Sequence, residues 1–322
     1  MTFFRFASAA LAAFVLAAPV SAQPFPSKPI QLAVTFAPGG GADITVRALA
    51  RAAEKHLGQP IVVQNKPAGG GAAAMQETAK AAPDGYTLVG LTAITATIAP
   101  HMRKVPYDGV KDFTPVMNYG AFNTFIAVRA DSPYKTFDEL LAFATKNPRV
   151  LTVGISVIGA SSHLGMARIA SERSVQVSFV PFGGGAPAAT ALLGRHVTAA
   201  ITAGEILPHV RSGEVRLLGT LMANKVEEFP QVPSIRDLGF GWDMLSWLGV
   251  AGPAGLPPAV TKQLEQAFLK SMDDAAFRKV MTELALVTLR QDAATAAKQL
   301  AGDHRDFGEL IKSLKIGLYE VR

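Results

Sequence analysis

The first strongly patterned segment of the chain is an apolar run, residues 30–36, that ends in a glycine-rich turn and leads directly into a helical pattern. The run predicts a buried strand, and Val46, Leu49 and Leu57 have helical spacing. Because Gly39–Gly41 carry no Cβ, the backbone can turn tightly there and present the free N–H groups and positive dipole end of the helix. Such a turn suits a small anion, and a plain strand-to-helix turn is the alternative interpretation.

Two similar units follow. Residues 61–82 predict a strand, a glycine-rich loop and a helix, and residues 86–97 predict a strand and a loop that carries the hydroxyls of Thr92 and Thr95. Repeated strand–loop–helix units predict a parallel sheet covered by helices, with ligands bound at the carboxyl ends of the strands. Each threonine hydroxyl could equally form a local turn or cap bond.

The second half of the chain repeats the pattern. Residues 136–146 predict a helix that begins with a capping box, and residues 151–173 predict a strand, a small-residue loop and a helix. Residues 175–202 predict two strands joined by a glycine-rich loop and a helix, and residues 215–221 a further strand. This half is therefore expected to build a second sheet with its own glycine- and hydroxyl-rich loops.

The remaining segments predict how the two sheets are connected. The proline-containing segment 229–233 is typical of a connector, and the apolar run 245–252 suits a return crossing to the first sheet. The tail, residues 258–314, predicts three helices and one short strand that pack on the first sheet. We therefore expect an α/β protein with two domains, each a mixed, mostly parallel sheet flanked by helices. Residues 23–122 with 246–322 would form domain 1, and residues 123–245 domain 2.

The amino-terminal residues 1–22 predict a signal peptide. Arg5 is followed by an apolar stretch and by small residues up to Ala22, which together favour cleavage before Gln23. The apolar stretch is short for a membrane span, and an uncleaved anchor is the lesser alternative. The chain of 322 residues has no cysteine, which excludes disulfides, thiolate metal sites and a cysteine nucleophile. An exported, soluble protein of the bacterial periplasm is expected.

Charge and motif spacing exclude several functions. The net charge of +6 is scattered along the chain, so it favours attraction of small anions and predicts no nucleic-acid patch. The six histidines lack metal-ligand spacing, and Gly39–Gly41 are followed by Ala42 and Asp43, not by the Lys-Ser/Thr of a phosphate loop. No metal and no cofactor are expected.

A Ser-Ser-His segment is the one candidate for catalysis. Ser162 and His163 could act in a hydrolase, but the pattern Gly-x-Ser-x-Gly is absent around Ser161 and Ser162. Capping of the following helix by Ser161 or Ser162 is the favoured interpretation. The hydrolase stays open as an alternative to a binding protein.

The motifs together resemble one known family. They are Phe36-Ala37-Pro38-Gly39-Gly40-Gly41-Ala42-Asp43 with Arg47, and the segments 65–70, 82–88, 112–116, 159–164, 180–184, 230–234 and 252–257. In this order they resemble the periplasmic solute-binding proteins of tripartite tricarboxylate transporters, the Bug or TctC-like proteins, over essentially the whole mature chain.

The resemblance implies a two-domain periplasmic-binding-protein fold (type II-like) that closes on a small carboxylate and delivers it to the permease subunits of a membrane transporter. It implies a non-enzymatic protein, expected to be a monomer; a ligand-presenting accessory of a signalling receptor is an alternative role. The implied ligand-binding residues are Phe36, Pro38, Gly39, Gly40, Gly41, Asp43, Thr92, Thr95, Ser156, Gly159, Ala160, Ser161, Ser162, His163, Phe182, Gly183, Gly184 and Thr202. Asp43 is expected to organise its own helix start or to pair with Arg47.

Two residues depart from the family pattern. Phe182 stands where the family commonly has tyrosine, so a hydrogen bond from that hydroxyl would be lost. Thr198 stands where the family frequently has an acidic residue, which favours a plain carboxylic acid over an amino-bearing ligand. The sequence leaves the identity of the carboxylate open.

Overall fold

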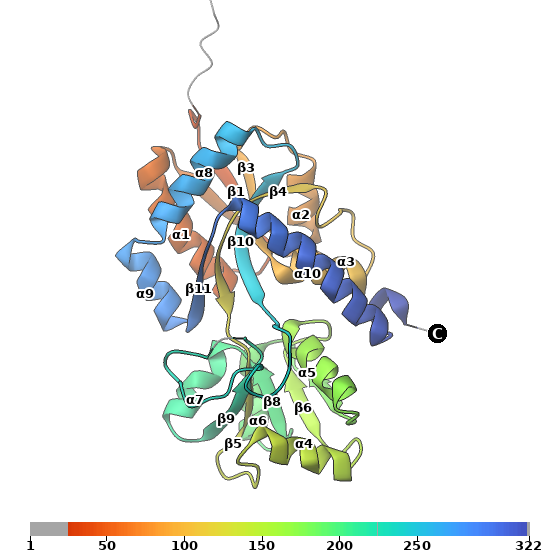
Figure 1. Cartoon of the computed structure of the whole chain (residues 1–322). Coiled ribbons are helices and arrows are strands. Elements are labelled where there is room, and N and C mark those ends of the chain that lie inside the picture. The colour runs from red at the N-terminus through yellow and green to blue at the C-terminus, as the bar shows by residue number, and fades with distance from the viewer. Residues whose placement is uncertain (1–24, 224, 321–322) are drawn as a thin grey trace, which may run out of the picture.

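The computed structural model describes residues 25–223 and 225–320, and these form two lobes (Figure 1). Each lobe is a mixed β-sheet with helices on both faces, as the sequence predicts. The predicted signal peptide, residues 1–22, lies outside the described residues. Among the described residues, no helix is both long enough and apolar enough to span a membrane.

The first lobe is built on a six-stranded sheet with the strand order β11-β4-β10-β3-β1-β2. Its strands are β1 (Ile30–Val34), β2 (Ile61–Asn65), β3 (Thr87–Thr92), β4 (Phe113–Phe122), β10 (Ser246–Pro253) and β11 (Leu286–Gln291). The pairs β1–β2 and β1–β3 are parallel, whereas β10 and β11 pair antiparallel with their neighbours. The sheet is therefore more mixed than expected, because the return strand β10 enters it between β3 and β4.

Helices cover both faces of this sheet. The helices α1 (Gly41–Leu57), α8 (Pro258–Ser271) and α9 (Ala275–Glu283) share one apolar cluster with β1 and β4. The helices α2 (Ala72–Ala79) and α10 (Ala293–Ser313) contribute Met75 and Leu300 to a second cluster. The predicted loop 92–97 is instead mostly helical: a π-helical turn (Ile94–Ile98) continues into α3 (Ala99–Met102).

The second lobe is built on a five-stranded sheet with the order β7-β6-β8-β5-β9. Its strands are β5 (Phe125–Arg129), β6 (Thr152–Ile155), β7 (Ser178–Pro181), β8 (Ala199–Thr202) and β9 (Val215–Thr220), and its helices are α4 (Phe137–Lys146), α5 (Ser161–Glu172), α6 (Gly185–Leu193) and α7 (Leu207–Arg211). Only β6–β7 and β6–β8 are parallel among its described pairs. The predicted capping box of α4 is confirmed, because Thr136 and Glu139 exchange side-chain and backbone bonds.

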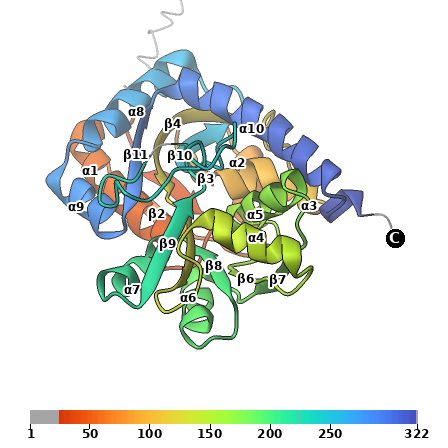
Figure 2. The ribbon, with the colours of Figure 1, turned by 60° about the horizontal axis from the view of Figure 1, so that its bottom comes forward.

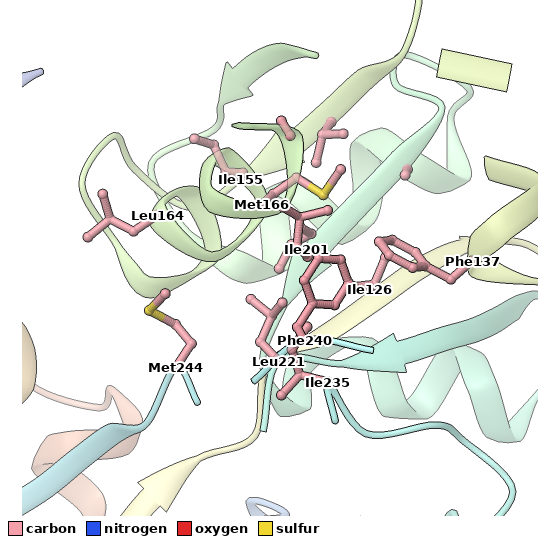
Figure 3. Close-up of a cluster of buried hydrophobic side chains, with 14 of the residues drawn as sticks. Ile126, Phe137, Ile155, Leu164, Met166, Ile201, Leu221, Ile235, Phe240 and Met244 are labelled. Carbon is pink, nitrogen blue, oxygen red and sulfur yellow. The ribbon is translucent and has the colours of Figure 1, made fainter. Parts of the chain in front are cut away.

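The core of the second lobe includes residues from the segment that leads back to the first lobe. Figure 3 shows Phe240 close to Ile126 and Phe137, and Met244 beside Leu164 of α5. The chain crosses between the lobes twice, at residues 123–124 and in the segment that precedes β10. The return crossing therefore starts from side chains that are packed in the core of the second lobe.

The tail packs on the first sheet as predicted, but α10 also reaches the second lobe (Figure 1 and Figure 2). Phe307 and Ile311 of α10 belong to the apolar cluster that holds Leu164 and Ile169 of α5. On the same helix, Asp303 accepts a 2.7 Å hydrogen bond from Trp247 Nε1 of β10. Thus α10 links the two lobes through apolar contacts in addition to the chain crossings.

Asp303 makes the stability of this region dependent on pH. Burial raises its pKa to about 6, the hydrogen bonds from Gln299 and Trp247 oppose this, and Asp306 and Asp243 add to it. The folded state therefore binds a proton on Asp303 more tightly than the unfolded state, and stability from this group is lost as the pH rises from 3.8 to about 6.

We predict that Asp303→Asn removes this pH dependence and keeps the acceptor for Trp247. Between about pH 4 and about pH 7, the free energy of unfolding of the wild type should fall relative to that of the variant. Denaturant unfolding at a series of pH values measures the difference. Asp306→Asn on the same helix, with a side chain that is 60% exposed, is the control and should behave nearly as the wild type. Parallel pH profiles for the wild type and Asp303→Asn would contradict the prediction.

Candidate functional site

A cavity of about 190 Å³ lies where the two lobes meet. It is lined by Ile94, Phe122, Thr124, Ser156, Ala160, Ser161, Ser162, Gly185, Ile201, Thr202, Ala203, Glu205 and Ser246. Phe122 and Thr124 flank the first chain crossing, and Ser246 begins the return strand β10. The cavity is therefore bounded by residues of both lobes and by both crossings.

The start of α5 supplies two of the hydroxyl groups on the cavity wall, those of Ser161 and Ser162. The helix begins after its N-cap residue, Ala160, and no side chain of the described residues caps it. The predicted capping by Ser161 or Ser162 is therefore wrong. The hydroxyl of Ser162 instead lies 3.3 Å from that of Ser156. Ser161 is 4% exposed, and its Oγ has no hydrogen-bond partner among the described residues.

The end of β8 supplies a second unpartnered hydroxyl. Thr202, the last residue of the strand, is 2% exposed, and its Oγ1 also lacks a partner among the described residues. A buried hydroxyl without a partner costs free energy, and such groups are rare in folded proteins. Two of them on the wall of one cavity indicate a site where a ligand supplies the missing acceptor.

Three helices begin at or next to this cavity without a side-chain cap from the described residues: α1, α5 and α6. Gly185, the first residue of α6, lines the cavity. Gly41, the first residue of α1, packs so closely on Phe122 that a Cβ there would lie 2.8 Å from Phe122 Cε1. By contrast α4, α9 and α10 are capped by threonine or aspartate side chains. The backbone N–H groups of the uncapped helices remain available to an anion.

Asp43 organises the first glycine turn. Its carboxylate accepts hydrogen bonds from Gly39 N at 2.9 Å, Arg47 Nε at 2.7 Å and Asn65 Nδ2 at 2.8 Å. Burial tends to raise the pKa of Asp43, but these hydrogen bonds outweigh it and hold the pKa below its usual value. The expected pairing with Arg47 is confirmed, and Asp43 has no direct position on the cavity wall.

The structure brings only some of the predicted residues to the cavity. Ser156, Ala160, Ser161, Ser162 and Thr202 line it. The others do not: they are Phe36, Pro38, Gly39, Gly40, Gly41, Asp43, Thr92, Thr95, Gly159, His163, Phe182, Gly183 and Gly184. Of these, the exposed turn around Gly40 borders the cavity through the contact of Gly41 with Phe122.

Several polar groups do not line the cavity because they form hydrogen bonds with one another. Thr92 and Thr95 share a 3.0 Å hydroxyl–hydroxyl bond, and the Thr95 carbonyl accepts a bond from Tyr107. The glycines of the second glycine-rich loop are covered by Arg103, whose guanidinium donates to Gly69 O and Gly70 O. These are local structural roles, as the alternative interpretation of the threonines anticipated.

Thr198 lies away from the candidate cavity. It precedes β8, whereas Thr202 ends the strand, so the two lie at opposite ends of it. The Thr198 hydroxyl is 3.1 Å from that of Thr152 and faces a different cavity, which Arg129 and Asp131 also line. Thr198 is therefore remote from the candidate cavity, and the expectation that it favours a plain carboxylic acid stays a prediction.

The geometry does not support a hydrolase. Ser162 pairs with Ser156, and His163 Nδ1 accepts a hydrogen bond from Gly159 N at 3.2 Å. The His163 ring packs edge-on against Phe179 and lines a separate cavity with Ile316. Burial lowers the pKa of His163, in agreement with a neutral ring that accepts a bond. Ser162 and His163 thus point to different surroundings.

A larger cavity, about 750 Å³, lies between α5, α10 and the segment before β10. Its wall carries Glu172, Asp243, Asp303, Asp306 and Glu309 beside a single cation, Arg168. That acidic wall disfavours an organic anion. Among the described residues no cluster of three or more metal-ligating side chains was found.

The sequence signals missed Phe122, Thr124, Glu205 and Ser246. Phe122, Thr124 and Ser246 adjoin the crossings, and Glu205 lies in a short 3-10 turn (Gly204–Ile206) after β8. A position next to a predicted crossing was the one available signal for the first three. Nothing in the local pattern around Glu205 distinguished it from a surface residue.

Two lobes joined by two crossings, with a hydroxyl-lined cavity between them, define a two-lobed ligand-binding protein. Residues 45–316 match the family model TctC, described as the tripartite tricarboxylate transporter family receptor. The chain belongs to this family of solute-binding receptors, which are not enzymes.

Individual proteins agree with this assignment. The chain is 37% identical over 277 residues to the UPF0065 protein in the gbd 5' region of Cupriavidus necator, which covers 86% of this chain and 84% of that protein. A TctC solute-binding protein from Polaromonas superposes with a TM-score of 0.81 at 29% identity, over 90% of this chain and 99% of that one. MatC from Rhodopseudomonas palustris with bound malate superposes with a TM-score of 0.74 at 27% identity, over 89% of this chain and 100% of that one.

The unpartnered hydroxyl of Thr202 predicts an unusual response to substitution. Thr202→Val removes a buried group that lacks a partner and keeps the shape of the side chain, so the free energy of unfolding without ligand should rise by about 1 kcal/mol. Denaturant unfolding measures the change.

The matched control is Thr220→Val on strand β9, which is separated from β8 by β5 in the same sheet. The Thr220 hydroxyl is buried, donates to Thr124 O at 3.1 Å and accepts from Met222 N at 3.2 Å. Its loss should lower the free energy of unfolding by roughly 1 kcal/mol or more. Equal destabilisation by both variants would show that Thr202 has a partner after all.

Proposed function

We propose that this protein captures a small organic carboxylate between its lobes and delivers it to the membrane permease subunits of a tripartite tricarboxylate-type transporter. In this proposal residues 1–22 direct export and are removed, and the mature chain acts in the periplasm as a monomer. No cofactor takes part in binding.

The observation that carries the proposal is the pair of buried hydroxyls, Ser161 Oγ and Thr202 Oγ1, that lack partners among the described residues and belong to one cavity. A carboxylate has acceptor oxygens for both donors and for the backbone N–H groups at the start of α5. Neutral donors of this kind hold a carboxylate ion without a cationic side chain.

Membership of the receptor family and the likeness to MatC, whose structure contains malate, support a small organic acid as the ligand. The cavity volume of about 190 Å³ favours a compact molecule. The ligand would be held while the lobes change their relative position.

For that movement we propose residues 23–122 with 246–322 and residues 123–245 as the two domains. Phe122, Thr124 and Ser246 flank the crossings and also line the cavity, so a bound ligand would contact the segments about which the domains move. Contacts made in only one arrangement of the domains would shift the population toward it, and the permease subunits could recognise that arrangement.

Gly40→Val tests the contribution of the first glycine turn. The backbone of Gly40 has φ −76°, and a Cβ would lie 3.6 Å from its nearest neighbour, Ala37 O, so the fold should tolerate valine. The added side chain would cover the uncapped start of α1 and should weaken binding of the carboxylate tenfold or more (roughly 1.4 kcal/mol). Titration calorimetry measures the affinity. Binding as tight as in the wild type would show that the start of α1 does not contribute to the site.

The ligand class can be found by a thermal-shift screen of dicarboxylic, tricarboxylic, aromatic and amino acids. A true ligand at a hundredfold excess over its Kd should stabilise the protein by about 2.7 kcal/mol. Ser161→Ala should reduce that gain, because it removes one of the two free donors. If no organic acid stabilises the protein, or Ser161→Ala leaves every gain intact, the proposed function is wrong.

A further inference from the structure

The candidate cavity contains one charged residue, and that residue is acidic. Of the described residues that line it, only Glu205 has an acidic side chain, and no lysine, arginine or histidine is among them. Glu205 is exposed and makes no hydrogen bond or ion pair with another described residue. Three other carboxylates on the second lobe, Asp131, Glu172 and Glu228, have arginine partners.

Glycines on both sides fix the place of this carboxylate. A Cβ at Gly185, the first residue of α6, would lie 2.7 Å from Glu205 Oε1 and 2.9 Å from Oε2. A Cβ at Gly204 would lie 2.7 Å from Leu284 O of the first lobe. The absence of side chains at Gly185 and Gly204 therefore lets Glu205 rest against the start of α6 while its turn contacts the opposite lobe.

This arrangement discriminates between organic acids by charge. One carboxylate of the ligand can use the hydroxyls of Ser161 and Thr202 and the backbone donors. A second carboxylate in the same cavity would face Glu205 with no cation on the wall to offset the repulsion. A protonated amine at that position would instead donate a charge-assisted hydrogen bond to Glu205.

We propose that the site selects a monocarboxylic acid that carries a protonated amine, and that Glu205 accepts the hydrogen bond from this amine. The proposal rests on the proposed function, because it needs the hydroxyl-lined cavity to hold the carboxylate. It assigns a ligand class that differs from the malate of MatC, which has two carboxylates and no amine.

The test uses matched ligands on the purified wild-type protein in titration calorimetry. Propionate is compared with alanine, and butyrate and succinate with 4-aminobutyrate. In at least one comparison the amino acid should bind tenfold or more tightly than its counterparts. Amine-free acids that bind as tightly as the amino acids in every comparison would overturn the proposal.

Two variants assign the preference to Glu205. Glu205→Gln should abolish the preference for the amino acid while the unaminated acids bind as well as before or better. Gly185→Ala retains the charge but displaces the carboxylate by its Cβ, and should reduce the preference. Glu228→Gln is the control for lost charge, since Glu228 pairs with Arg211 outside the cavity, and should leave the preference unchanged. A preference that survives in Glu205→Gln, with folding confirmed by thermal unfolding, would also overturn the proposal.

Failure of the underlying function gives a different result. If none of these acids binds and the wider acid screen is also negative, the assignment of a carboxylate site is wrong. The proposed preference for an amine is then wrong as well. If acids bind, are weakened by Ser161→Ala and show no preference for the amine, only the role of Glu205 is wrong.

Discussion

The backbone N–H groups at the start of a helix need acceptors, and the starts of α1, α5 and α6 receive none from described side chains. Three other helices meet this need with Thr136, Asp274 and Asp292, whereas α2 and α8 also begin without a side-chain cap. What distinguishes the starts of α1, α5 and α6 is their place at or next to the cavity. A ligand can reach the backbone donors there, and the stability lost without a ligand can be regained on binding.

The connections between the lobes tie this donor site to the rest of the fold. Phe122, Thr124 and Ser246 adjoin the two crossings and line the cavity, so a ligand bound there would contact the residues that flank both crossings. The helix α10 adds a third connection, because Phe307 and Ile311 pack with α5. A change in lobe arrangement must therefore alter apolar contacts of α10 as well as contacts in the cavity, which favours discrete arrangements over continuous deformation.

Local patterns predicted most of the fold, and five of the predicted site residues lie on the cavity wall. Apolar runs and glycine turns predicted the strands and helices of both lobes, since these signals act within a few residues. The pairing of Thr92 with Thr95 and the covering of Gly69 and Gly70 by Arg103 were not predictable, because they depend on which neighbours fold into reach. Ser161, a ligand-binding residue by resemblance, lies on the cavity wall, but it does not cap its helix and its hydroxyl has no partner among the described residues.

The difference between Thr198 and Glu205 shows why membership of a family does not determine the ligand. Thr198 occupies a position singled out by resemblance, yet it lies at the far end of β8 and bonds with Thr152. Glu205 follows the same strand at its other end and is the one charged residue on the cavity wall among those described. In the proposed site, the neutral donors would hold one carboxylate whatever the remainder of the ligand is. Discrimination between ligands must then come from the residues that contact the rest of the ligand. Among the described residues on the wall, the carboxylate of Glu205 makes the largest electrostatic difference.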